Sequence, residues 1–99
     1  MAKYIIEFTS EAKIDLSYFN AFERKIILNN INNQLTSEPT IETRNRKRLR
    51  ENPFSNWALR IGKYRVFYHV MEDILTISIV AVGFKEHNNL YIRGKKVKI

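Results

Sequence analysis

The segment from residue 57 to residue 82 constrains the fold most, because apolar and polar side chains alternate along it. Alternation is typical of half-buried strands, since successive side chains of a strand point to opposite faces of a sheet. Gly62 and Lys63 interrupt the pattern with glycine in first place, as a two-residue type II′ hairpin turn prefers. Glu72 and Asp73 form a second, less distinctive turn. We therefore expect three antiparallel strands: Trp57–Ile61, Tyr64–Met71 and residues 74–82.

The turn at Gly62 and Lys63 sets the register of the hairpin and places Arg60 opposite Arg65. One face of the sheet then collects apolar side chains: Trp57, Leu59, Ile61, Val66, Tyr68, Val70, Leu75, Ile77 and Ile79. We expect that face to pack against helices. The other face carries Arg60, Arg65, His69, Thr76 and Ser78, with Phe67 among them.

The facing pair Arg60 and Arg65 is the first candidate functional feature. Like charges directly opposite each other destabilise a strand pair. An anion between them would reverse the sign, and two guanidinium groups are well suited to hold one phosphate. The alternative is an ordinary solvated face on which both side chains point into water.

The first third of the chain predicts a strand and then a helix. Residues 3–8 are mostly β-branched and aromatic, which favours a strand. Thr9 or Ser10 can cap the helix that follows. The apolar face of this helix consists of Ala12, Leu16 and Phe19.

A second, longer helix is expected over Ala21–Leu35, after Asn20 as a break or a cap. Its apolar side consists of Phe22, Ile26, Ile27, Ile31 and Leu35. Two adjacent helices with a short joint form a helical hairpin. The predicted class is therefore α+β, with an N-terminal strand and a two-helix hairpin on one face of a four-stranded, mainly antiparallel sheet.

Residues 36–56 predict a loop, because Pro39 and Pro53 argue against one uninterrupted helix. Its middle is crowded with positive charge: Arg44, Arg46, Lys47, Arg48 and Arg50. These residues either track RNA phosphates or form a solvated loop. Beyond Gly83, where the third strand is expected to end, residues 90–92 form a short last strand. A basic tail at residues 93–99 carries Arg93, Lys95, Lys96 and Lys98, and either binds the same polyanion or is disordered.

The composition narrows the function. The chain has 99 residues, which argues for a single domain over residues 1–99, and 17 Lys and Arg against 10 acidic residues give a net charge of +7. Such a surface attracts polyanions, nucleic acid above all, although small proteins also carry excess charge for solubility. The absence of cysteine excludes disulfides and thiolate metal sites and fits a reducing cytosol. No apolar run reaches the length of a membrane span, so we expect a cytoplasmic protein.

The segment LRIGKYRVFYHV, residues 59–70, resembles the RelE/ParE toxin superfamily. The resemblance also covers the opening KYIIEFTSEA, Asp15 and Leu16, RLR before the sheet, Val82 and Gly83, Lys85, and Leu90 and Tyr91. The pattern from Leu59 to Tyr68 is specific for the superfamily and much less specific for activity. The resemblance implies a RelE-like fold and a toxin of a type II toxin–antitoxin system, with a cognate antitoxin protein as its partner.

Two activities follow from this resemblance. RelE-like members enter the ribosomal A site and cut mRNA there, with the ribose 2′-hydroxyl attacking the adjacent phosphate and with no metal or cofactor. ParE-like members inhibit DNA gyrase and carry out no chemistry of their own. A catalytically inactive member that binds only its partner or its operator is a third possibility. Ribosome-dependent mRNA cleavage by an endoribonuclease is the leading expectation.

Cleavage needs a group to take the 2′ proton, cations to hold the phosphorane charge, and an acid for the leaving oxygen. By resemblance, Arg65 stabilises the transition-state phosphate, Lys85 is the cationic acid, and Tyr91 stacks on or orients a nucleotide. The expected phosphate contacts beside them are Arg60, Lys63, Arg44, Arg46, Lys47, Arg48 and Arg50.

The residue that takes the 2′ proton stays unassigned. RelE-type members carry two lysines on the strand before the hairpin, and here those positions are Asn56 and Ala58. The candidates are His69, His87, Lys47 and Lys63. Histidine titrates near neutral pH, but a lone histidine is more often a polar surface residue.

Overall fold

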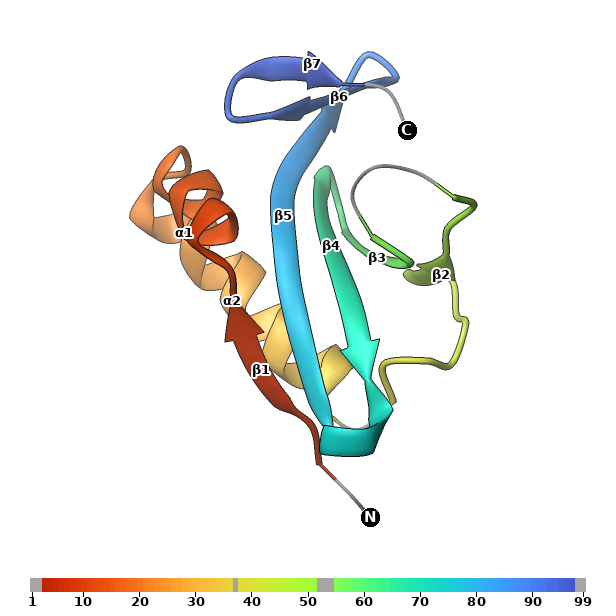
Figure 1. The fold of residues 1–99 in the computed structure, drawn as a ribbon. Helices are drawn as coiled ribbons and strands as arrows, with labels where there is room; N and C mark the ends of the chain where they lie inside the picture. Colours follow the sequence, from red (N-terminus) through yellow and green to blue (C-terminus); the bar gives the residue numbers. More distant parts are fainter. Residues whose placement is uncertain (1–2, 37, 52–54, 98–99) are drawn as a thin grey trace.

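The computed structural model describes residues 3–36, 38–51 and 55–97, and it confirms the α+β class (Figure 1). Two helices, α1 (Ser10–Ser17) and α2 (Ala21–Leu35), pack on one face of a sheet. Within the described residues this sheet has seven strands, rather than the four that the sequence predicted: β1 (Ile5–Phe8), β2 (Arg46–Arg48), β3 (Trp57–Ile61), β4 (Tyr64–Met71), β5 (Thr76–Glu86), β6 (Asn89–Ile92) and β7 (Lys95–Val97). The order is β2-β3-β4-β5-β6-β7, all antiparallel, and β1 pairs in parallel with β5.

Both helices begin at the capping residues that the sequence predicts. Thr9 Oγ1 accepts a hydrogen bond from the Ala12 N–H at 3.2 Å. At α2 the Asn20 side chain accepts from the Glu23 N–H, and the Glu23 carboxylate accepts from the Asn20 N–H, which completes a capping box. Asn20 therefore separates the two helices as a cap, and the predicted bounds of α2 are confirmed.

The buried stripe of α2 is narrower than predicted. Ile27, Ile31 and Leu35 are buried at a spacing of four residues, and Ile26 is half-buried. Phe22 is 72% exposed, so its assignment to the apolar side was wrong. At 3.6 residues per turn, Phe22 lies roughly 140° around the helix from Ile27 and points away from the sheet.

The β3–β4 hairpin has the predicted turn and register. Gly62 has a φ of 57°, while Lys63 stays outside the left-handed region, as in a type II′ turn. Arg60 pairs with Arg65, and the predicted register holds along the whole of β3. A local signal, glycine in the first position of a two-residue turn, was therefore sufficient to place the side chains of both strands.

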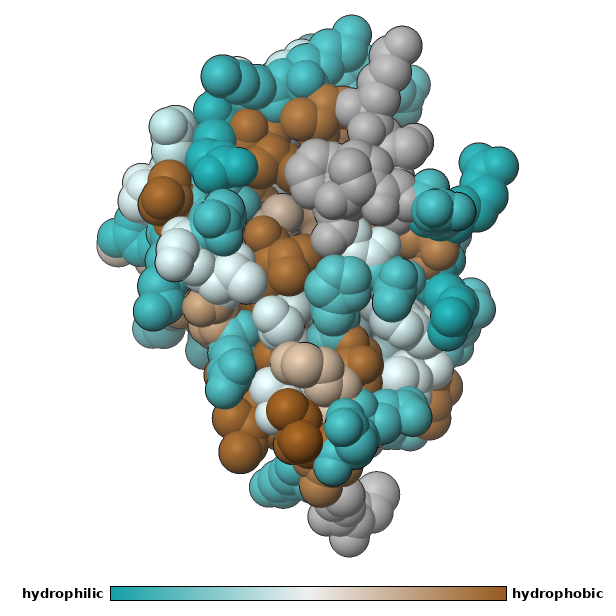
Figure 2. Space-filling model, viewed as in Figure 1, coloured by the Kyte–Doolittle hydropathy of each residue, from teal (hydrophilic) through white to brown (hydrophobic). Residues whose placement is uncertain are grey.

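The predicted apolar face of the sheet packs against the helices. Its buried members are Trp57, Leu59, Ile61, Val66, Tyr68, Ile77 and Ile79, and Val70 is half-buried. Leu75 was wrongly included, because it is 38% exposed and adopts a left-handed φ of 46°. A short 3₁₀ helix, Glu72–Ile74, occupies the predicted turn and strand start, so β5 begins at Thr76. Figure 2 shows hydrophobic surface at the lower end of the molecule, where this segment lies.

A β-bulge at Val80 changes which side chains of β5 face the helices. The pairing of β5 with β4 skips Val80, so β5 carries one extra residue at this point. Strict alternation from Ile79 would have placed Lys85 on the helix-covered face. With the bulge, Val82 packs into the core beneath the helices and Lys85 faces the opposite way.

β5 continues to Glu86, although the sequence predicted its end at Gly83. A Cβ atom on Gly83 would collide with the carbonyl oxygen of Tyr91, so glycine allows the backbone of β6 to lie close to β5. The glycine thus marks a close approach of two strands rather than a strand end. The short strand predicted at residues 90–92 is confirmed and begins one residue earlier.

Two segments predicted to lack regular structure contain strands. β2 lies within the predicted loop and pairs with β3, and β7 lies within the predicted tail and pairs with β6. The turn before β7 uses Arg93 and Gly94, whose φ angles of 53° and 73° fit a type I′ hairpin. Pro53 and Lys98 lie outside the described residues.

A smaller apolar cluster lies on the face away from the helices, which we call the open face. Phe67, Ala81, Leu90 and Ile92 are buried in it. Phe67 therefore lies on the predicted polar face but is covered there. The cover comes from the end of β2 and from the β6–β7 hairpin, through the partly buried residues Leu49 and Val97.

Candidate functional site

A groove with a volume of about 670 Å³ lies on the open face, and we call it the basic groove. Its cationic lining residues are Arg44, Lys47, Arg60, Arg65, Lys85 and Lys96. The other lining residues are Asn45, Asn88, Asn89, Leu49, Ala58, Phe67, Leu90 and Val97. Among the described residues that line the groove there is no aspartate or glutamate, so no acidic side chain compensates its positive charge from within.

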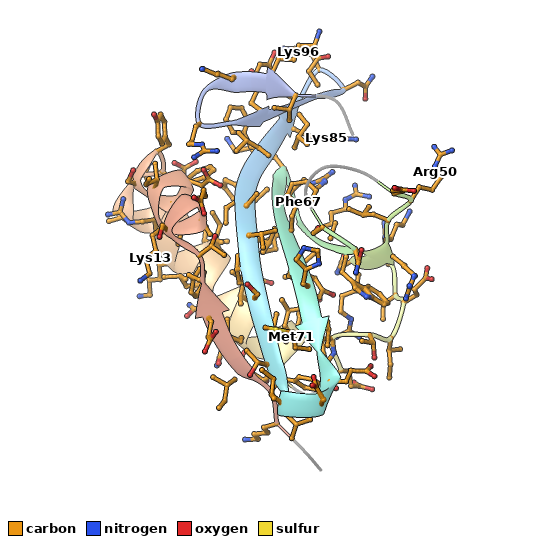
Figure 3. All side chains as sticks on the ribbon, viewed as in Figure 1. Lys13, Arg50, Phe67, Met71, Lys85 and Lys96 are labelled. Atoms are coloured by element: carbon orange, nitrogen blue, oxygen red, sulfur yellow. The ribbon has the colours of Figure 1, made fainter. Side chains whose placement is uncertain are left out.

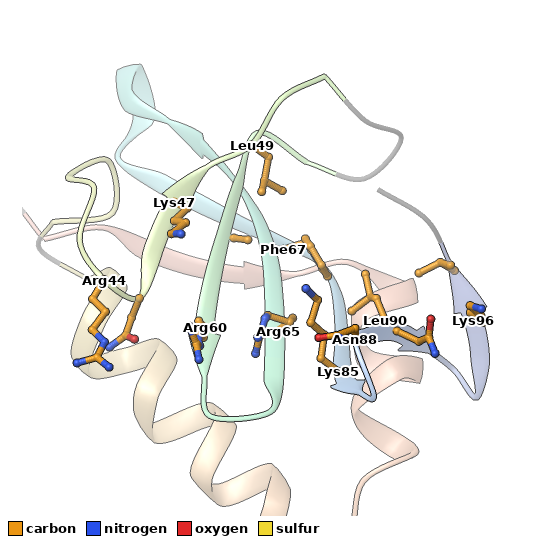
Figure 4. A pocket seen from close by; sticks show the side chains of 14 residues that line it. Arg44, Lys47, Leu49, Arg60, Arg65, Phe67, Lys85, Asn88, Leu90 and Lys96 are labelled. Atoms are coloured by element: carbon orange, nitrogen blue, oxygen red, sulfur yellow. The ribbon is translucent and has the colours of Figure 1, made fainter.

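The cations form a row that crosses the strands (Figure 4). In chain order, Arg44 precedes β2, Lys47 lies on β2, Arg60 on β3, Arg65 on β4, Lys85 on β5 and Lys96 on β7. Arg44 and Lys47 are close in the sequence, and the sheet pairing brings them together with the cations of β3, β4, β5 and β7. The complete row therefore could not be seen in the sequence.

Arg60 and Arg65 face each other at the centre of the row. Arg65 is half-buried, and its Nη1 donates to the carbonyl oxygens of Gly62 at 2.7 Å and Tyr64 at 2.9 Å. Burial and, to a smaller extent, the charge of Arg60 lower the pKa of Arg65. The two guanidinium groups therefore repel each other in a partly desolvated place, and an anion held between them would relieve this repulsion.

The remaining groove cations are available to a ligand. Across residues 3–36, 38–51 and 55–97, the side chains of Arg44, Lys47, Arg60, Lys85 and Lys96 form no hydrogen bond or ion pair with another described residue. Charges that no protein group neutralises are paired with solvent ions or with a bound polyanion.

Apolar side chains form the floor of the groove. Phe67 is 2% exposed and Leu90 is 7% exposed, and both line it. Figure 3 shows Phe67 along β4, with Lys85 and Lys96 towards the upper end of the sheet. A low-dielectric floor strengthens the attraction between the cations and a bound anion. The apolar surface that a ligand can reach comes from the partly exposed lining residues Leu49, Ala58 and Val97.

Tyr91 does not join Arg65 and Lys85. The pairing of β5 with β6 places Lys85 opposite Leu90, so Tyr91 points to the helix-covered face. There its ring stacks on Phe84 at a centroid distance of 5.3 Å. The structure thus brings two of the three predicted catalytic residues into the groove and places the third behind the sheet.

Arg46 also lies apart from the groove, although it was predicted as a phosphate contact. It is 9% exposed, its Nε donates to the Ile41 carbonyl oxygen at 3.1 Å, and its Nη1 donates to the Gln34 carbonyl oxygen. Arg46 therefore ties the loop after α2 to β2. Its neighbours Arg48 and Arg50 are exposed but do not line the groove.

Lys63 belongs to a different network at the hairpin turn. Its Nζ lies 3.9 Å from the Glu23 carboxylate and 5.6 Å from the centre of the Tyr64 ring. The Tyr64 hydroxyl donates to the same carboxylate at 2.8 Å, and burial together with this bond raises the pKa of Tyr64 to about 12. The network anchors the turn to α2 and holds Lys63 away from the groove.

Neither of the candidate histidines lines the groove. His69 is half-buried on β4 and pairs with Ser78, further from the hairpin turn than Phe67. The His87 side chain is 88% exposed in the turn between β5 and β6, 3.9 Å from the Glu86 carboxylate. The sequence also missed the groove residues Asn45, Asn88 and Asn89. The signal for the last two is turn chemistry, because asparagine tolerates the left-handed φ of 65° that Asn88 adopts.

A buried carboxylate links α1 to β5 and to the β6–β7 turn. Asp15 on α1 is 1% exposed, its Oδ2 accepts from the Val82 N–H at 3.0 Å, and its Oδ1 lies 3.0 Å from Arg93 Nε. Burial raises the pKa of Asp15 by more than these two partners lower it. Because Arg93 sits in the β6–β7 turn, the contact links α1 to the hairpin that supplies Lys96.

Within the described part of the chain, no three His, Asp or Glu side chains gather where they could hold a metal ion. Nor does that part contain a helix long and apolar enough to cross a membrane.

The protein is thus a small basic α+β protein, with a two-helix hairpin on one face of its sheet and a cationic groove on the other. The family model of the ParE toxin of type II toxin–antitoxin systems, parDE, matches residues 6–88. The chain belongs to this family of toxins, within the RelE/ParE superfamily. No curated protein matches the sequence.

Several solved structures share the fold, including the following two. One is a chain in the crystal structure of the toxin–antitoxin complex RelBE2 from Mycobacterium tuberculosis, with 26% identity and a TM-score of 0.75, covering 86% of this chain and 94% of that one. The other is a chain in the archaeal RelE–RelB complex from Pyrococcus horikoshii OT3. It has 18% identity and a TM-score of 0.68, and covers 86% of this chain and 98% of that one, which shows the fold alone.

Proposed function

We propose that this toxin binds mRNA in the basic groove and cleaves it on the ribosome, and so inhibits translation in the cytoplasm. The observation that supports this proposal is the lining of the groove, with six cations and no acidic side chain among the described residues. Single-stranded RNA carries a charge at every nucleotide and exposes its bases, so a cationic groove with an apolar floor suits it.

We assign different roles to the guanidinium and ammonium groups of the groove. Arg60 and Arg65 hold the scissile phosphate between them and neutralise the phosphorane, because arginine stays charged and does not transfer protons. Lys85, on the strand next to Arg65, gives a proton to the leaving 5′-oxygen. The 2′-oxygen forms a bond to phosphorus as the bond to the 5′-oxygen breaks, which leaves a 2′,3′-cyclic phosphate and a 5′-hydroxyl.

Tyr91 and Arg46 are not among the contacts in this proposal. Arg46 is committed to backbone carbonyl groups. Tyr91 stays a prediction from the family resemblance, and a stacking role would require RNA to reach the helix side of β6. Arg44 and Lys96 extend the phosphate track to both sides of the central pair.

A cognate antitoxin protein is the second proposed partner. Membership of a toxin–antitoxin family supports it, and both similar structures come from toxin–antitoxin complexes. A partner with acidic residues would complement the net charge of +7.

Inhibition of DNA gyrase is a second candidate function, favoured by the ParE description of the matching family model. Under this function the groove cations would contact gyrase or its DNA and no bond would be broken. A catalytically inactive member would show neither effect.

The proposal is tested by expressing the toxin and following the synthesis of new protein and new DNA by pulse labelling. The nuclease function predicts an early stop in translation, with cleavage sites in mRNA that map by primer extension and require ribosomes in a purified system. A prompt replication block with normal translation would instead establish the gyrase function.

Two variants sharpen this experiment. Arg65→Ala should lower the cleavage rate by about 10²–10³-fold, as expected for loss of one transition-state contact. Lys13→Ala removes one charge from the exposed surface of α1, on the other side of the sheet, and should leave cleavage unchanged. Because the Arg65 guanidinium also bonds the hairpin turn, the thermal unfolding of each variant is measured in parallel. A folded Arg65→Ala protein with full activity would remove Arg65 from the site.

Salt dependence tests the phosphate track independently of cleavage. If Arg44, Arg60, Arg65, Lys85 and Lys96 all contact single-stranded RNA phosphates, log affinity should fall with log salt with a slope of about −3.5. The measurement uses an RNA that lacks the 2′-hydroxyl at the scissile position and therefore cannot be cut. A slope near zero would rule out the groove as a polyanion site.

A further inference from the structure

The residue that takes the 2′ proton can be assigned from the pairing of β2 with β3. Lys47 lies directly opposite Ala58, on the same face of the sheet, and both residues line the basic groove. Facing side chains on neighbouring antiparallel strands have β-carbons about 5 Å apart. Because the Ala58 side chain is short, it leaves space in the groove that the Lys47 side chain can reach from the adjacent strand.

Lys47 and Lys85 lie on opposite sides of the arginine pair. Lys47 of β2 pairs with Ala58, two residues along β3 from Arg60 and away from the hairpin turn. Lys85 of β5 lies two residues past Gly83, the partner of Arg65, towards the turn. The two lysines therefore lie on a diagonal through the arginine pair, and Figure 4 shows them on either side of it. In an in-line displacement, the attacking and leaving oxygens lie on opposite sides of phosphorus. A phosphate held between the two arginines would therefore present one oxygen towards each lysine.

The other candidates for this role lie elsewhere. Lys63 is placed against Glu23 and Tyr64, outside the groove, and neither histidine lines it. The remaining lining residues on the Lys47 side are arginines, an asparagine and apolar residues, none of which accepts a proton. Among the described residues, Lys47 is thus the titratable group on that side of the arginine pair.

We propose that Lys47 is the general base of the cleavage reaction, an inference that rests on the proposed nuclease function. The neutral amine of Lys47 takes the proton of the 2′-hydroxyl while the 2′-oxygen bonds to phosphorus. The bond to the 5′-oxygen breaks, and the ammonium group of Lys85 gives its proton to that oxygen. The two lysines end with exchanged protonation states, which solvent restores.

The experiment compares RNA binding with single-turnover cleavage of ribosome-bound mRNA in wild type, Lys47→Ala, Lys47→Arg and the double variant Lys47→Ala with Ala58→Lys. Arginine keeps the charge but cannot act as a base, so Lys47→Arg should bind RNA like the wild type and cleave it about 10²–10⁴-fold more slowly. The double variant moves the amine to the facing position on β3 and should recover much of the rate lost in Lys47→Ala.

The outcomes separate this assignment from the function on which it rests. Cleavage by Lys47→Arg at the wild-type rate would overturn the assignment, since a permanent cation would then suffice. Equal loss of binding and cleavage in Lys47→Ala, or a double variant no faster than Lys47→Ala, would overturn it as well. A wild-type protein that cuts no RNA would overturn the proposed function, and the role of Lys47 with it. Lys13→Ala is the matched control, because it removes one lysine from α1.

Discussion

The two faces of β3 and β4 are built from alternate residues of the same two strands and have opposite character. Leu59 and Val66 are fully buried beneath the helices, whereas Arg60 and Arg65, one residue along each strand, face the basic groove. Burial of apolar side chains stabilises the first face. The second face carries like charges at paired positions, which costs stability until an anion binds. The comparison indicates that neighbouring residues of one strand serve different purposes: one stabilises the fold and the next is available to bind an anion.

The largest expected effect is on the helix-covered face. Leu59→Ala should lower the free energy of unfolding by about 2–5 kcal/mol, because it removes a fully buried side chain and leaves a cavity. Urea denaturation with linear extrapolation measures the change. A loss below about 1 kcal/mol would show that this face is not packed as tightly as its burial indicates.

A smaller loss of stability is expected at Asp15, which joins α1 to β5 and to the β6–β7 turn. Asp15→Ala should cost about 1–3 kcal/mol, because the buried Val82 N–H loses its acceptor. Asp15→Asn keeps an acceptor oxygen and should cost less. If both variants are equally destabilised, the ion pair with Arg93, rather than the bond to Val82, is the important contact. Denaturation of the three proteins under one condition decides between these outcomes.

The pH dependence of stability tests the burial of the same carboxylate. Because the pKa of Asp15 is raised from its ordinary value of 3.8, the folded protein holds this proton more tightly than the unfolded chain does. The stability contributed by Asp15 is then fully present below pH 3.8 and is lost as pH rises through the raised folded value.

Denaturation across the acidic range should therefore show wild type losing stability relative to Asp15→Asn as pH rises. Comparing wild type with Asp15→Asn also cancels the effect of Glu23 on the pH dependence of stability, because both proteins contain Glu23. The pKa of Glu23 is lowered, mainly by the hydrogen bond from Tyr64, so its effect has the opposite sign. A difference between the two proteins that does not vary with pH would contradict the burial of an ionisable Asp15.

The smallest expected effect is on the open face and has the opposite sign. Arg60→Gln should raise the free energy of unfolding by about 0.2–1 kcal/mol, since it removes one of two facing like charges. The same change should weaken RNA binding. High salt should reduce the gain in stability. A variant that loses stability would show that Arg60 contributes packing that outweighs its repulsion of Arg65.

Local patterns were sufficient for much of the fold. The start of α2 followed from its capping residue, and the register of β3 with β4 followed from the turn at Gly62. Both depend on residues close together in the chain. The strand pairs involving β2 and β7 were missed, because three-residue edge strands have little pattern of their own and form on a partner that is already in place.

The sequence by itself determined that Arg60 faces Arg65 and that the chain carries an excess of positive charge for a polyanion. Only the tertiary structure decided which other side chains line the basic groove together with Arg60 and Arg65. The bulge at Val80 turns Lys85 into the groove, and the pairing of β6 turns Tyr91 out of it. Successive side chains of a strand point to alternate faces of the sheet, so one inserted residue reverses the face of every residue after it. Only the pairing with a distant strand shows where that insertion occurs.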